Sequence, residues 1–264
     1  MCTLIAALHR HADYPLFVAA NRDEFYAREA TPPERVGHYV AGRDLASGGT
    51  WLGVTTRGFF VGLTNQRAWD GSTPGTRSRG EVVRAALEAA SVDPTRRLLE
   101  GLDARSTGGF NLLFGDAHQL WVAYARPTDA AVRTHPLEPG IHVLANDELG
   151  SPHFPKSPRA AERAAGLLDA RGEALVRGFE ALLADRSLPP LDEVPAPPDG
   201  AFIDHSTAHR LQALCVETPV YGTVSAAILG IVDGSVALHR ASPTAPRPGS
   251  FVDVLPLHSA TVGG

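Results

Sequence analysis

The sequence predicts a layered α+β protein, and three observations lead to that class. Short apolar runs typical of strands occur near both ends of the 264-residue chain. Segments with the apolar spacing of helices lie between groups of these runs. Several of the runs are apolar at consecutive positions, which indicates strands that are covered on both faces. Strands, then helices, then strands again favour stacked layers over repeated βαβ units.

Nine apolar runs are expected to form strands, and the first two are expected to form a hairpin. A turn-like His-Ala-Asp-Tyr segment separates these two runs. Arg57 and Gly58 predict a second hairpin between the third and fourth runs. The nine runs are 2–8, 15–20, 51–55, 59–64, 110–114, 120–125, 141–145, 226–232 and 235–238.

Helices are expected in two places. Ser78 and Glu81 fit a capping box, which predicts a helix that begins there. Asp93 and Pro94 predict the cap and the first-turn proline of the helix that follows. Helical spacing over 158–185, with one break, predicts a helical pair.

The whole chain, 1–264, is expected to form a single domain. The proline-rich segment 188–200 predicts an extended loop, because proline disrupts helices and central strands. Too few strand-like runs follow this loop to build an independent core. The helical pair and the loop together, 158–200, are therefore interpreted as a peripheral insertion in that domain.

Composition and charge exclude several classes of function. A net charge of -5 gives no general basic field for nucleic acid or for an anionic membrane surface. No apolar run approaches the length of a membrane span, and the first residues lack the basic flank of a secretory signal. Because Cys2 and Cys215 are the only cysteines, a disulfide framework is not expected and a reducing cytoplasm is the default compartment. A small-molecule partner is the class that remains, and the sequence indicates no oligomeric state.

The common cofactor and metal motifs are absent from the sequence. It contains no glycine-rich dinucleotide or phosphate loop, no zinc-protease motif, no serine-hydrolase elbow and no Cys-x-x-Cys. His9 with His11, and His205 with His209, have metal-like spacing, but neither pair has acidic or thiol residues that complete a site. Surface or loop roles are favoured for these histidines. We therefore expect neither a metal nor a cofactor.

Cys2 is the strongest candidate for chemistry. Removal of Met1 would give Cys2 a free α-amine, whose reference pKa of about 7.7–8.0 lets it accept the thiol proton near neutral pH. Nucleophile and base would then share one residue, and a cysteine thiol needs only modest help to become a thiolate. The alternative is that Cys2 is a small apolar residue in a buried strand, which is the commonest state of a free cysteine.

An Asn-Arg-Asp-Glu segment, 21–24, directly follows the second apolar run. Antiparallel pairing of the first two strands would bring this segment opposite Cys2. Asp23 is then placed to hold the α-amine by a charge-assisted hydrogen bond. Asn21 and Arg22 are candidate substrate contacts, and the arginine suits an anionic group or the support of Asp23. The alternative interpretation is a solvated turn with local caps.

Two further asparagines end apolar runs. Asn65 follows the run 59–64, and Asn146 follows the run 141–145. Amide groups fixed at strand ends can donate hydrogen bonds to a developing oxyanion. The alternative is that both are turn asparagines, favoured for local hydrogen bonding.

A set of short motifs is spread over nearly the whole chain. They are Met-Cys-Thr-Leu-Ile at 1–5, Ala-Asn-Arg-Asp-Glu-Phe-Tyr at 20–26, Gly-Arg-Asp-Leu at 42–45, Gly-Gly-Thr-Trp-Leu-Gly at 48–53, Thr-Asn at 64–65, Ser-Arg-Gly at 78–80, Gly-Phe-Asn at 109–111, Leu-Ala-Asn at 144–146, Ser-Pro at 151–152 and Tyr-Gly-Thr at 221–223. Their combination resembles the NRDE family, the transport-and-Golgi-organisation family named after its Asn-Arg-Asp-Glu motif. That family is similar to the N-terminal nucleophile hydrolases, near the bile-salt hydrolase and penicillin V acylase group. The resemblance implies a four-layer αββα sandwich.

The resemblance also implies roles for single residues. It implies Cys2 as the nucleophile with Asp23 beside it. It implies Asn65 and Asn146 as groups that position the oxyanion or the amine.

One position departs from the family pattern. An arginine commonly follows Tyr-Gly-Thr in the family, whereas this chain has Val224. An arginine there would stabilise a thiolate or a charged tetrahedral species. The catalytic interpretation therefore requires Arg22 or another arginine in its place.

Two hypotheses of function follow, from different classes. The first is a hydrolase of linear, non-peptide amides that acts through a thioester acyl-enzyme on Cys2. The second is a ligand-binding or trafficking protein without turnover, for haem or acyl-CoA, which fits Val224 and the links of the family to haem mobilisation and lipid homeostasis. A weaker third hypothesis is a thiol-based redox or acyl-transfer protein that uses Cys2 and Cys215.

Overall fold

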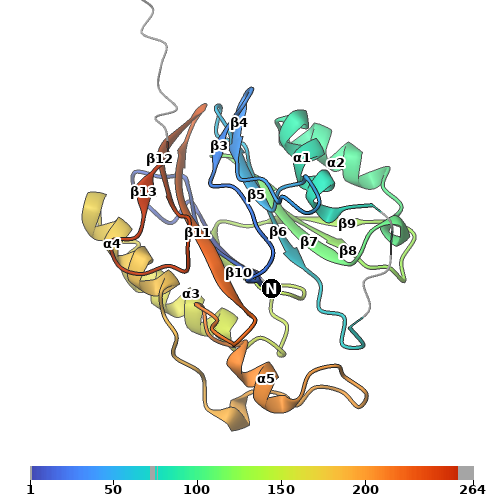
Figure 1. Cartoon of the computed structure of the whole chain (residues 1–264). Coiled ribbons are helices and arrows are strands. Elements are labelled where there is room, and N and C mark those ends of the chain that lie inside the picture. Colours follow the sequence, from blue (N-terminus) through green and yellow to red (C-terminus); the bar gives the residue numbers. More distant parts are fainter. Residues whose placement is uncertain (1, 72–74, 76, 255–264) are drawn as a thin grey trace, which may run out of the picture.

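Two antiparallel sheets lie face to face, and a layer of helices covers the outer side of each (Figure 1). The computed structural model describes residues 2–71, 75 and 77–254, so Met1 and the final segment 255–264 lie outside the described residues. The order of layers is helix, sheet, sheet, helix, which confirms the α+β class and the four-layer αββα sandwich.

The first sheet contains the strand that begins at Cys2. Its strand order is β10-β1-β2-β11-β12-β13, so β1 lies inside the sheet with a partner on each side. The predicted hairpin of the first two strands is confirmed by the antiparallel pairing of β1 with β2. The strands are β1 Cys2–Leu8, β2 Leu16–Phe25, β10 Gly140–Leu144, β11 Tyr221–Val232, β12 Ser235–Ser242 and β13 Val252–Asp253.

The second sheet follows the chain in order, from β3 to β9. The predicted hairpin at Gly58 joins β5 to β6, and this glycine has a φ of 82°, which other residues adopt only with strain. The strands are β3 Glu34–Val36, β4 Tyr39–Ala41, β5 Leu52–Thr55, β6 Phe60–Asn65, β7 Phe110–Gly115, β8 Leu120–Ala125 and β9 Arg133–Leu137. The sequence did not predict β3, β4, β9 and β13, because these strands are short or mostly exposed and carry no long apolar run.

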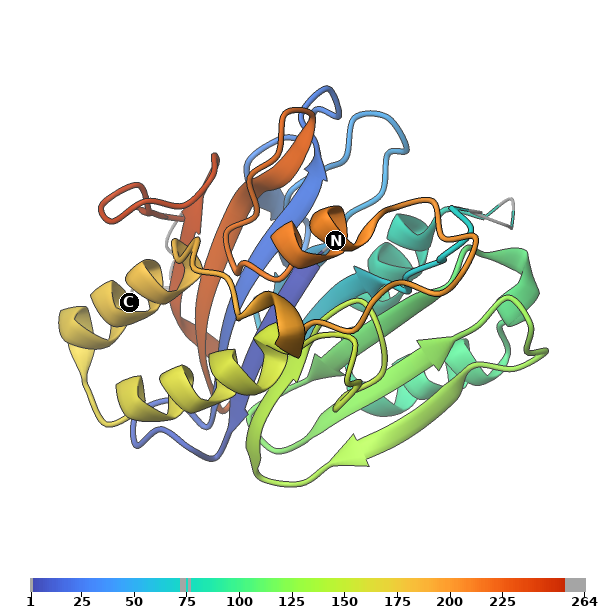
Figure 2. The same cartoon turned by 90° about the horizontal axis from the view of Figure 1, so that it is seen from below.

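Helices α1 and α2 cover the seven-stranded sheet, and α3 and α4 cover the six-stranded sheet (Figure 2). The helices are α1 Arg79–Ala89, α2 Val92–Glu100, α3 Lys156–Leu167, α4 Gly172–Leu183 and α5 His205–Arg210, with short 3-10 helices η1 Ala104–Ser106 and η2 Leu191–Glu193.

The alternation of side chains along β1 divides them between two cores. Leu4 and Leu8 pack between the sheets, whereas Ile5 and Ala7 pack against the layer of α3 and α4. All seven residues of β1 are buried. Burial on both faces explains why this run is apolar at consecutive positions.

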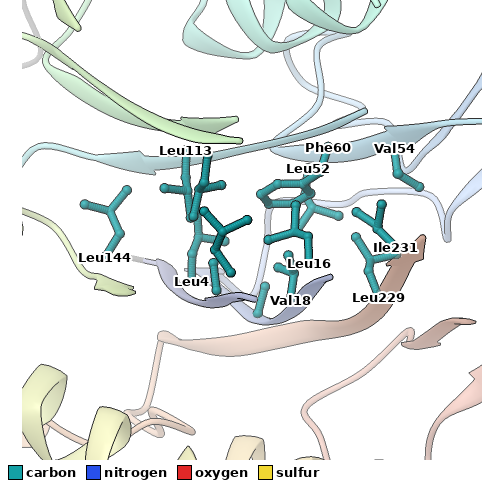
Figure 3. Close-up of a cluster of buried hydrophobic side chains, with 14 of the residues drawn as sticks. Leu4, Leu16, Val18, Leu52, Val54, Phe60, Leu113, Leu144, Leu229 and Ile231 are labelled. Carbon is teal, nitrogen blue, oxygen red and sulfur yellow. The ribbon is translucent and has the colours of Figure 1, made fainter. Parts of the chain in front are cut away.

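The core between the sheets is built from both of them (Figure 3). Figure 3 labels Leu4, Leu16, Val18, Leu52, Val54, Phe60, Leu113, Leu144, Leu229 and Ile231. These side chains meet in the space between the two sheets. The apolar core ends near Cys2 and Arg22, which lie on the faces of β1 and β2 that are directed between the sheets.

The predicted helical pair forms a layer of the sandwich. Phe179 of α4 is fully buried and its ring lies 4.7 Å from that of Phe17 on β2. The other side chains of the pair in this core are Ala160, Ala164, Leu168, Leu175, Val176, Leu182 and Leu183. Helices α3 and α4 thus form one side of a core that they share with β1, β2 and β11, where the sequence suggested a peripheral insertion. The proline-rich segment is extended, with the short helix η2 inside it.

Two local boundaries differ from expectation. The cap of α2 is Ser91, not Asp93, so Pro94 is the third residue of the helix; it is tolerated there because the first backbone N–H groups of a helix have no partner within it. Ser78 is the cap of α1 as predicted, although its side chain makes no capping hydrogen bond. Strand β2 continues through 21–24, because both β1 and β11 pair with that segment. The alternative prediction of a solvated turn at 21–24 is therefore wrong.

Within the described part of the chain, no helix combines the length and the apolar character that crossing a membrane requires.

Because Phe179 is buried between α4 and the six-stranded sheet, its truncation should cause a large loss of stability. Phe179→Ala should lower the free energy of unfolding by about 3–5 kcal/mol, measured by chemical denaturation, because it leaves a cavity under α4. Leu191→Ala, at a residue that is 50% exposed, is the control and should change it by less than about 0.5 kcal/mol. Equally small effects of the two substitutions would show that α4 does not share a core with the six-stranded sheet.

Candidate active site

The pairing of β1 and β2 brings the Asn-Arg-Asp-Glu segment beside Cys2. Cys2 lies opposite Arg22, and Thr3 lies opposite Asn21. On the other side of β2, Asp23 is paired with Thr223 of β11. The register therefore confirms the predicted approach of segment 21–24 to Cys2.

The alternation of side chains decides which residues of this group share a face. Cys2 is on the same face of β1 as Leu4, and Arg22 is on the same face of β2 as Val18, so both point between the sheets. Both line a cavity of about 480 Å³ that continues from the core between the sheets. Asn21 is on the opposite face, toward the helices.

The cavity has apolar and charged walls. Its apolar lining includes Val40, Leu52, Leu63, Ala227 and Val224. Its polar and charged lining includes Asp23, Glu24, Arg28, Arg43, Asp44, Asn65, Arg77, Arg79 and His239. A volume of this size fits a small organic molecule.

Asp23 is held by several hydrogen bonds. The Thr223 hydroxyl donates to Asp23 Oδ1 at 2.6 Å, and the Tyr221 hydroxyl donates to the Asp23 carbonyl at 3.0 Å. The backbone N–H of Val216 donates to the Thr223 hydroxyl oxygen at 2.8 Å, which leaves the hydroxyl hydrogen directed at the carboxyl group. The register of β11 shifts between Thr223 and Ser225, which allows Thr223 to meet Asp23 on the helix side of the sheet.

Burial dominates the electrostatics of this group. It raises the pKa of the Cys2 thiol, while the Asp23 backbone N–H and the Arg22 guanidinium lower that pKa to a smaller extent. Burial also raises the pKa of the Asp23 carboxyl group, and the charge of Lys156 and the hydrogen bond from Thr223 oppose this rise. The thiol therefore needs a base nearby to become a thiolate at neutral pH.

Lys156, which the sequence analysis did not single out, completes this charged group. It is the first residue of α3 and is only 1% exposed. Burial lowers the pKa of its ammonium group, and the charges of Asp23 and, more weakly, Cys2 raise it. The signal was available in the sequence: Lys156 is the single lysine among 24 basic residues. Arginine is too large and too planar to replace it without change in a buried position.

Arginines occupy the cavity wall next to Cys2. Arg22 binds Asp44 at 2.9 Å, and Arg28 binds the same carboxylate at 2.7 Å. The Arg22 guanidinium is therefore engaged by a protein carboxylate, where the sequence suggested a substrate anion.

Arg79 and Arg43 both line the cavity, and Arg79 is the one whose charge interacts with Cys2. It is the first residue of α1 and makes no ion pair within the described part of the chain; its guanidinium donates to the Gly109 carbonyl at 3.4 Å. Burial lowers the pKa of Arg79, and the charges of Glu24 and of Cys2 act in the opposite direction. Arg79 is thus within electrostatic reach of Cys2, in the cavity that Val224 also lines.

The three predicted asparagines have different positions. Asn65 ends β6 and lines the cavity. Asn146 is fully buried, and its amide donates to the Asn65 backbone carbonyl at 2.7 Å. This hydrogen bond holds the end of β6 in place. The Asn21 amide donates to the carbonyls of Leu183 and Leu214 at 2.8 and 2.9 Å. Asn21 ties β2 to the helical layer and does not contact the cavity, contrary to its expected role as a substrate contact.

The histidine pairs hold loops in place. The His205 ring bonds to the Val194 carbonyl and the His209 ring to the Pro189 carbonyl, both at 2.8 Å, which secures the proline-rich segment. The His9 ring bonds to the carbonyl of Ala117 at 2.9 Å. In the parts of the chain that the structure describes, no three His, Cys, Asp or Glu side chains converge as metal ligands.

Comparisons with known proteins agree with the fold. The family model for Transport and Golgi organisation 2 matches residues 1–238. The human Transport and Golgi organization protein 2 homolog is 29% identical over 253 residues, 87% of each chain. The homolog from Bos taurus is 31% identical over 252 residues, 89% of each chain. Among solved structures, a variant of conjugated bile acid hydrolase from Clostridium perfringens is similar with a TM-score of 0.50 and 11% identity, over 96% of this chain and 92% of that chain.

The buried charges of Asp23 and Lys156 should prove coupled in a double-mutant cycle. Lys156→Met should lower the free energy of unfolding by about 1–2 kcal/mol, because it removes a positive charge that favours the ionised form of the buried Asp23 carboxyl group. Combining it with Asp23→Asn should recover more than about 1 kcal/mol relative to the sum of the single effects. The control Arg163→Met, at an exposed ion pair with Asp185 on the surface of the same helix, should cost less than about 1 kcal/mol.

The pH dependence of this cost has a defined sign. Without Lys156, the pKa of folded Asp23 rises further above that of the unfolded chain, about 3.9. The folded variant then keeps this proton to a higher pH than folded wild type does, so its stability relative to wild type falls as pH rises through the raised pKa of Asp23 in the folded wild-type protein. Purely additive effects, or a cost of Lys156→Met that does not grow with pH, would contradict the coupling of Lys156 to Asp23.

Proposed function

The chain belongs to the Transport and Golgi organisation 2 family and has the fold of the N-terminal nucleophile hydrolases, and from that premise we propose that it hydrolyses linear, non-peptide amides with Cys2 as nucleophile. One observation carries the proposal. Cys2 lines a cavity that Asp23, Asn65 and Arg79 also line. The proposed nucleophile therefore has a carboxyl group, an amide and a guanidinium in the same cavity.

The proposed reaction needs no group beyond the mature chain, the amide and water. After removal of Met1, the Cys2 α-amine takes the thiol proton, and the thiolate attacks the amide carbonyl carbon. The resulting ammonium gives its proton to the leaving nitrogen as the C–N bond breaks, which leaves a thioester on Cys2. The amine then takes a proton from water, the hydroxide attacks the thioester, and the carboxylic acid leaves as the thiol is restored.

Asp23 serves this mechanism as a positioning residue. A carboxylate beside the start of β1 favours the ammonium form of the amine when the proton has been transferred. The Thr223 hydroxyl and the Lys156 charge favour ionised Asp23 against the effect of burial. These contacts support a carboxylate that is fixed before substrate arrives, so little reorganisation is needed during the reaction.

Asn65 and Arg79 are the proposed partners of the oxyanion. Asn65 lines the cavity, with Asn146 holding its backbone carbonyl. The guanidinium of Arg79 supplies the positive charge that the family takes from the position of Val224 in this chain. A single donor to an oxyanion contributes about 2.7–4 kcal/mol to the stability of a transition state in a well-studied protease.

The lining of the cavity supports a substrate class. Apolar residues deeper between the sheets suit an acyl chain, and arginines near Cys2 suit an amine portion that carries negative charge. Both cysteines are free thiols, and since Cys2 must stay reduced to act, we propose a reducing compartment such as the cytoplasm.

A binding function without turnover is the second candidate, and Val224 favours it. With no arginine at that position and a buried thiol, the same cavity would serve as a carrier site for haem or acyl-CoA. Carriage does not require the free α-amine, so a purified chain that retains Met1, binds either ligand saturably and turns over no amide would select this candidate.

Replacing Cys2 should abolish hydrolysis. Cys2→Ala should reduce the turnover of dodecanoyl 4-nitroanilide, followed by the colour of released nitroaniline, at least about a thousandfold. Cys215→Ala is the control, because Cys215 is also a buried free thiol, and it should keep the activity. Wild-type protein whose mass shows loss of Met1, yet whose turnover equals that of Cys2→Ala on every amide tested, would refute the proposal.

Arg79 should set the reactivity of the thiol. Arg79→Met should shift the pH profile of Cys2 alkylation by iodoacetamide upward by about one pH unit, since a nearby cation stabilises the thiolate and lowers the thiol pKa. Arg84→Met, at an exposed arginine of the same helix paired with Glu88, should leave the profile unchanged. A profile that is the same in all three proteins would remove Arg79 from the mechanism.

A further inference from the structure

A second polar group lies in the cavity, apart from the cluster around Cys2. His239 of β12 lines the cavity and is only 8% exposed. Neither of its ring nitrogens has a hydrogen-bond partner among the described residues. Buried polar groups are nearly always hydrogen-bonded in folded proteins, so an imidazole without a protein partner at a cavity wall points to a ligand.

The strand register fixes the distance of His239 from Cys2. His239 is paired with Leu229 of β11, whereas Cys2 is connected through Arg22 to Ser225 of that strand. His239 is thus three strands across and four residues along the sheet from Cys2. With the usual spacings of strands and residues, the two positions are roughly 20 Å apart.

Apolar side chains line the cavity together with its polar and charged residues. Leu52 and Val40 line it from the seven-stranded sheet, and Ala227 lines it from β11. The backbone at His239 is anchored, because the N–H of Val254 donates to its carbonyl at 3.0 Å. The imidazole is therefore a fixed polar group within a partly apolar cavity.

The state of the ring limits the chemistry of its ligand. Burial lowers the pKa of His239 to about 4, so the imidazole is neutral at pH 7. A neutral imidazole offers one N–H donor and one nitrogen acceptor. A hydroxyl group can pair with either nitrogen, a carboxylate can only accept, and an alkyl end can do neither.

We infer that His239 forms a second subsite, which binds a neutral hydroxyl group at the distal end of the acyl chain of the substrate. This inference rests on the proposed function for the position of the amide at Cys2. It adds a specificity determinant: chains that end in a hydroxyl group are preferred over chains that end in a methyl group. A site built to pair with a hydroxyl group rejects the analogue that lacks it, because the buried polar group stays unpaired.

The test measures binding separately from turnover. Three glycine amides are titrated calorimetrically into the Cys2→Ala protein: N-dodecanoylglycine, its 12-hydroxy analogue, and the analogue with a terminal carboxylate. The hydroxyl analogue should bind about tenfold more tightly than the methyl compound, as one hydrogen bond to a buried group implies. The carboxylate analogue should bind no better than the methyl compound.

Variants of His239 identify the group responsible. On the Cys2→Ala background, His239→Phe should remove the preference for the hydroxyl group, and His239→Gln, which keeps a donor and an acceptor, should retain part of it. His135→Phe, at an exposed histidine of β9 that does not line the cavity, should keep the full preference. If His239→Phe fails to fold, the comparison of the three ligands on the Cys2→Ala protein still shows whether the cavity prefers the hydroxyl group.

Each outcome has one meaning. Equal affinity for the hydroxyl and methyl compounds, tightest binding of the carboxylate, or binding of none of the three overturns the inference. Hydrolysis by wild-type protein without a hydroxyl preference overturns the inference and leaves the proposed function standing. A hydroxyl preference that depends on His239, without hydrolysis of any amide, supports the subsite and overturns the proposed function.

Discussion

The position of β1 inside a sheet between two covered faces is the constraint on which the rest of the structure depends. Strand β1 pairs with β2 on one side and β10 on the other, and all of its residues are buried. Its first residue, Cys2, is paired with Arg22 of β2, and the ladder to β10 begins two residues further along, at Leu4. A nucleophile near a chain end would ordinarily be mobile, because terminal residues are poorly ordered unless they are tied down. Here the sheet holds Cys2 in place, as the catalytic role proposed for it requires.

The same burial disfavours charge on Cys2 and Asp23, and surrounding residues offset part of this cost. Removing Cys2 and Asp23 from water disfavours their ionised forms. Lys156 and the Thr223 hydroxyl favour ionised Asp23, and Arg22 and Arg79 interact favourably with an ionised Cys2. Buried charges in this fold are thus compensated as a group, and the loss of one member leaves the others more costly to bury.

Much of this arrangement could be predicted from the sequence, because it depends on local patterns. Consecutive apolar residues identified β1 and β2, and the hairpin between them brought Cys2 to Arg22 without knowledge of the rest of the fold. The αββα order came from the family resemblance. Strands such as β3 and β9 had no pattern to find, because their residues are mostly exposed and are held by pairing with neighbours.

Side-chain direction and long-range contacts could not be predicted in the same way. The face on which Asn21 lies depends on the register and on which layer covers each side of the sheet. The charge of Lys156 acts on Asp23 although the two residues are far apart in sequence, and His239 of β12 lines the same cavity as Cys2. Such contacts are determined by topology, which composition and spacing do not encode.

Capture of the acyl-enzyme is the direct test of Cys2 as the nucleophile. Wild-type protein is mixed with excess dodecanoyl 4-nitroanilide, quenched in acid at short times and digested, and the mass of the peptide that begins at Cys2 is measured. If Cys2 is the nucleophile, a dodecanoyl adduct on Cys2 forms before steady-state turnover and is released by neutral hydroxylamine, as expected for a thioester. Turnover with no adduct on this peptide, or an adduct on Cys215 in its place, would contradict it.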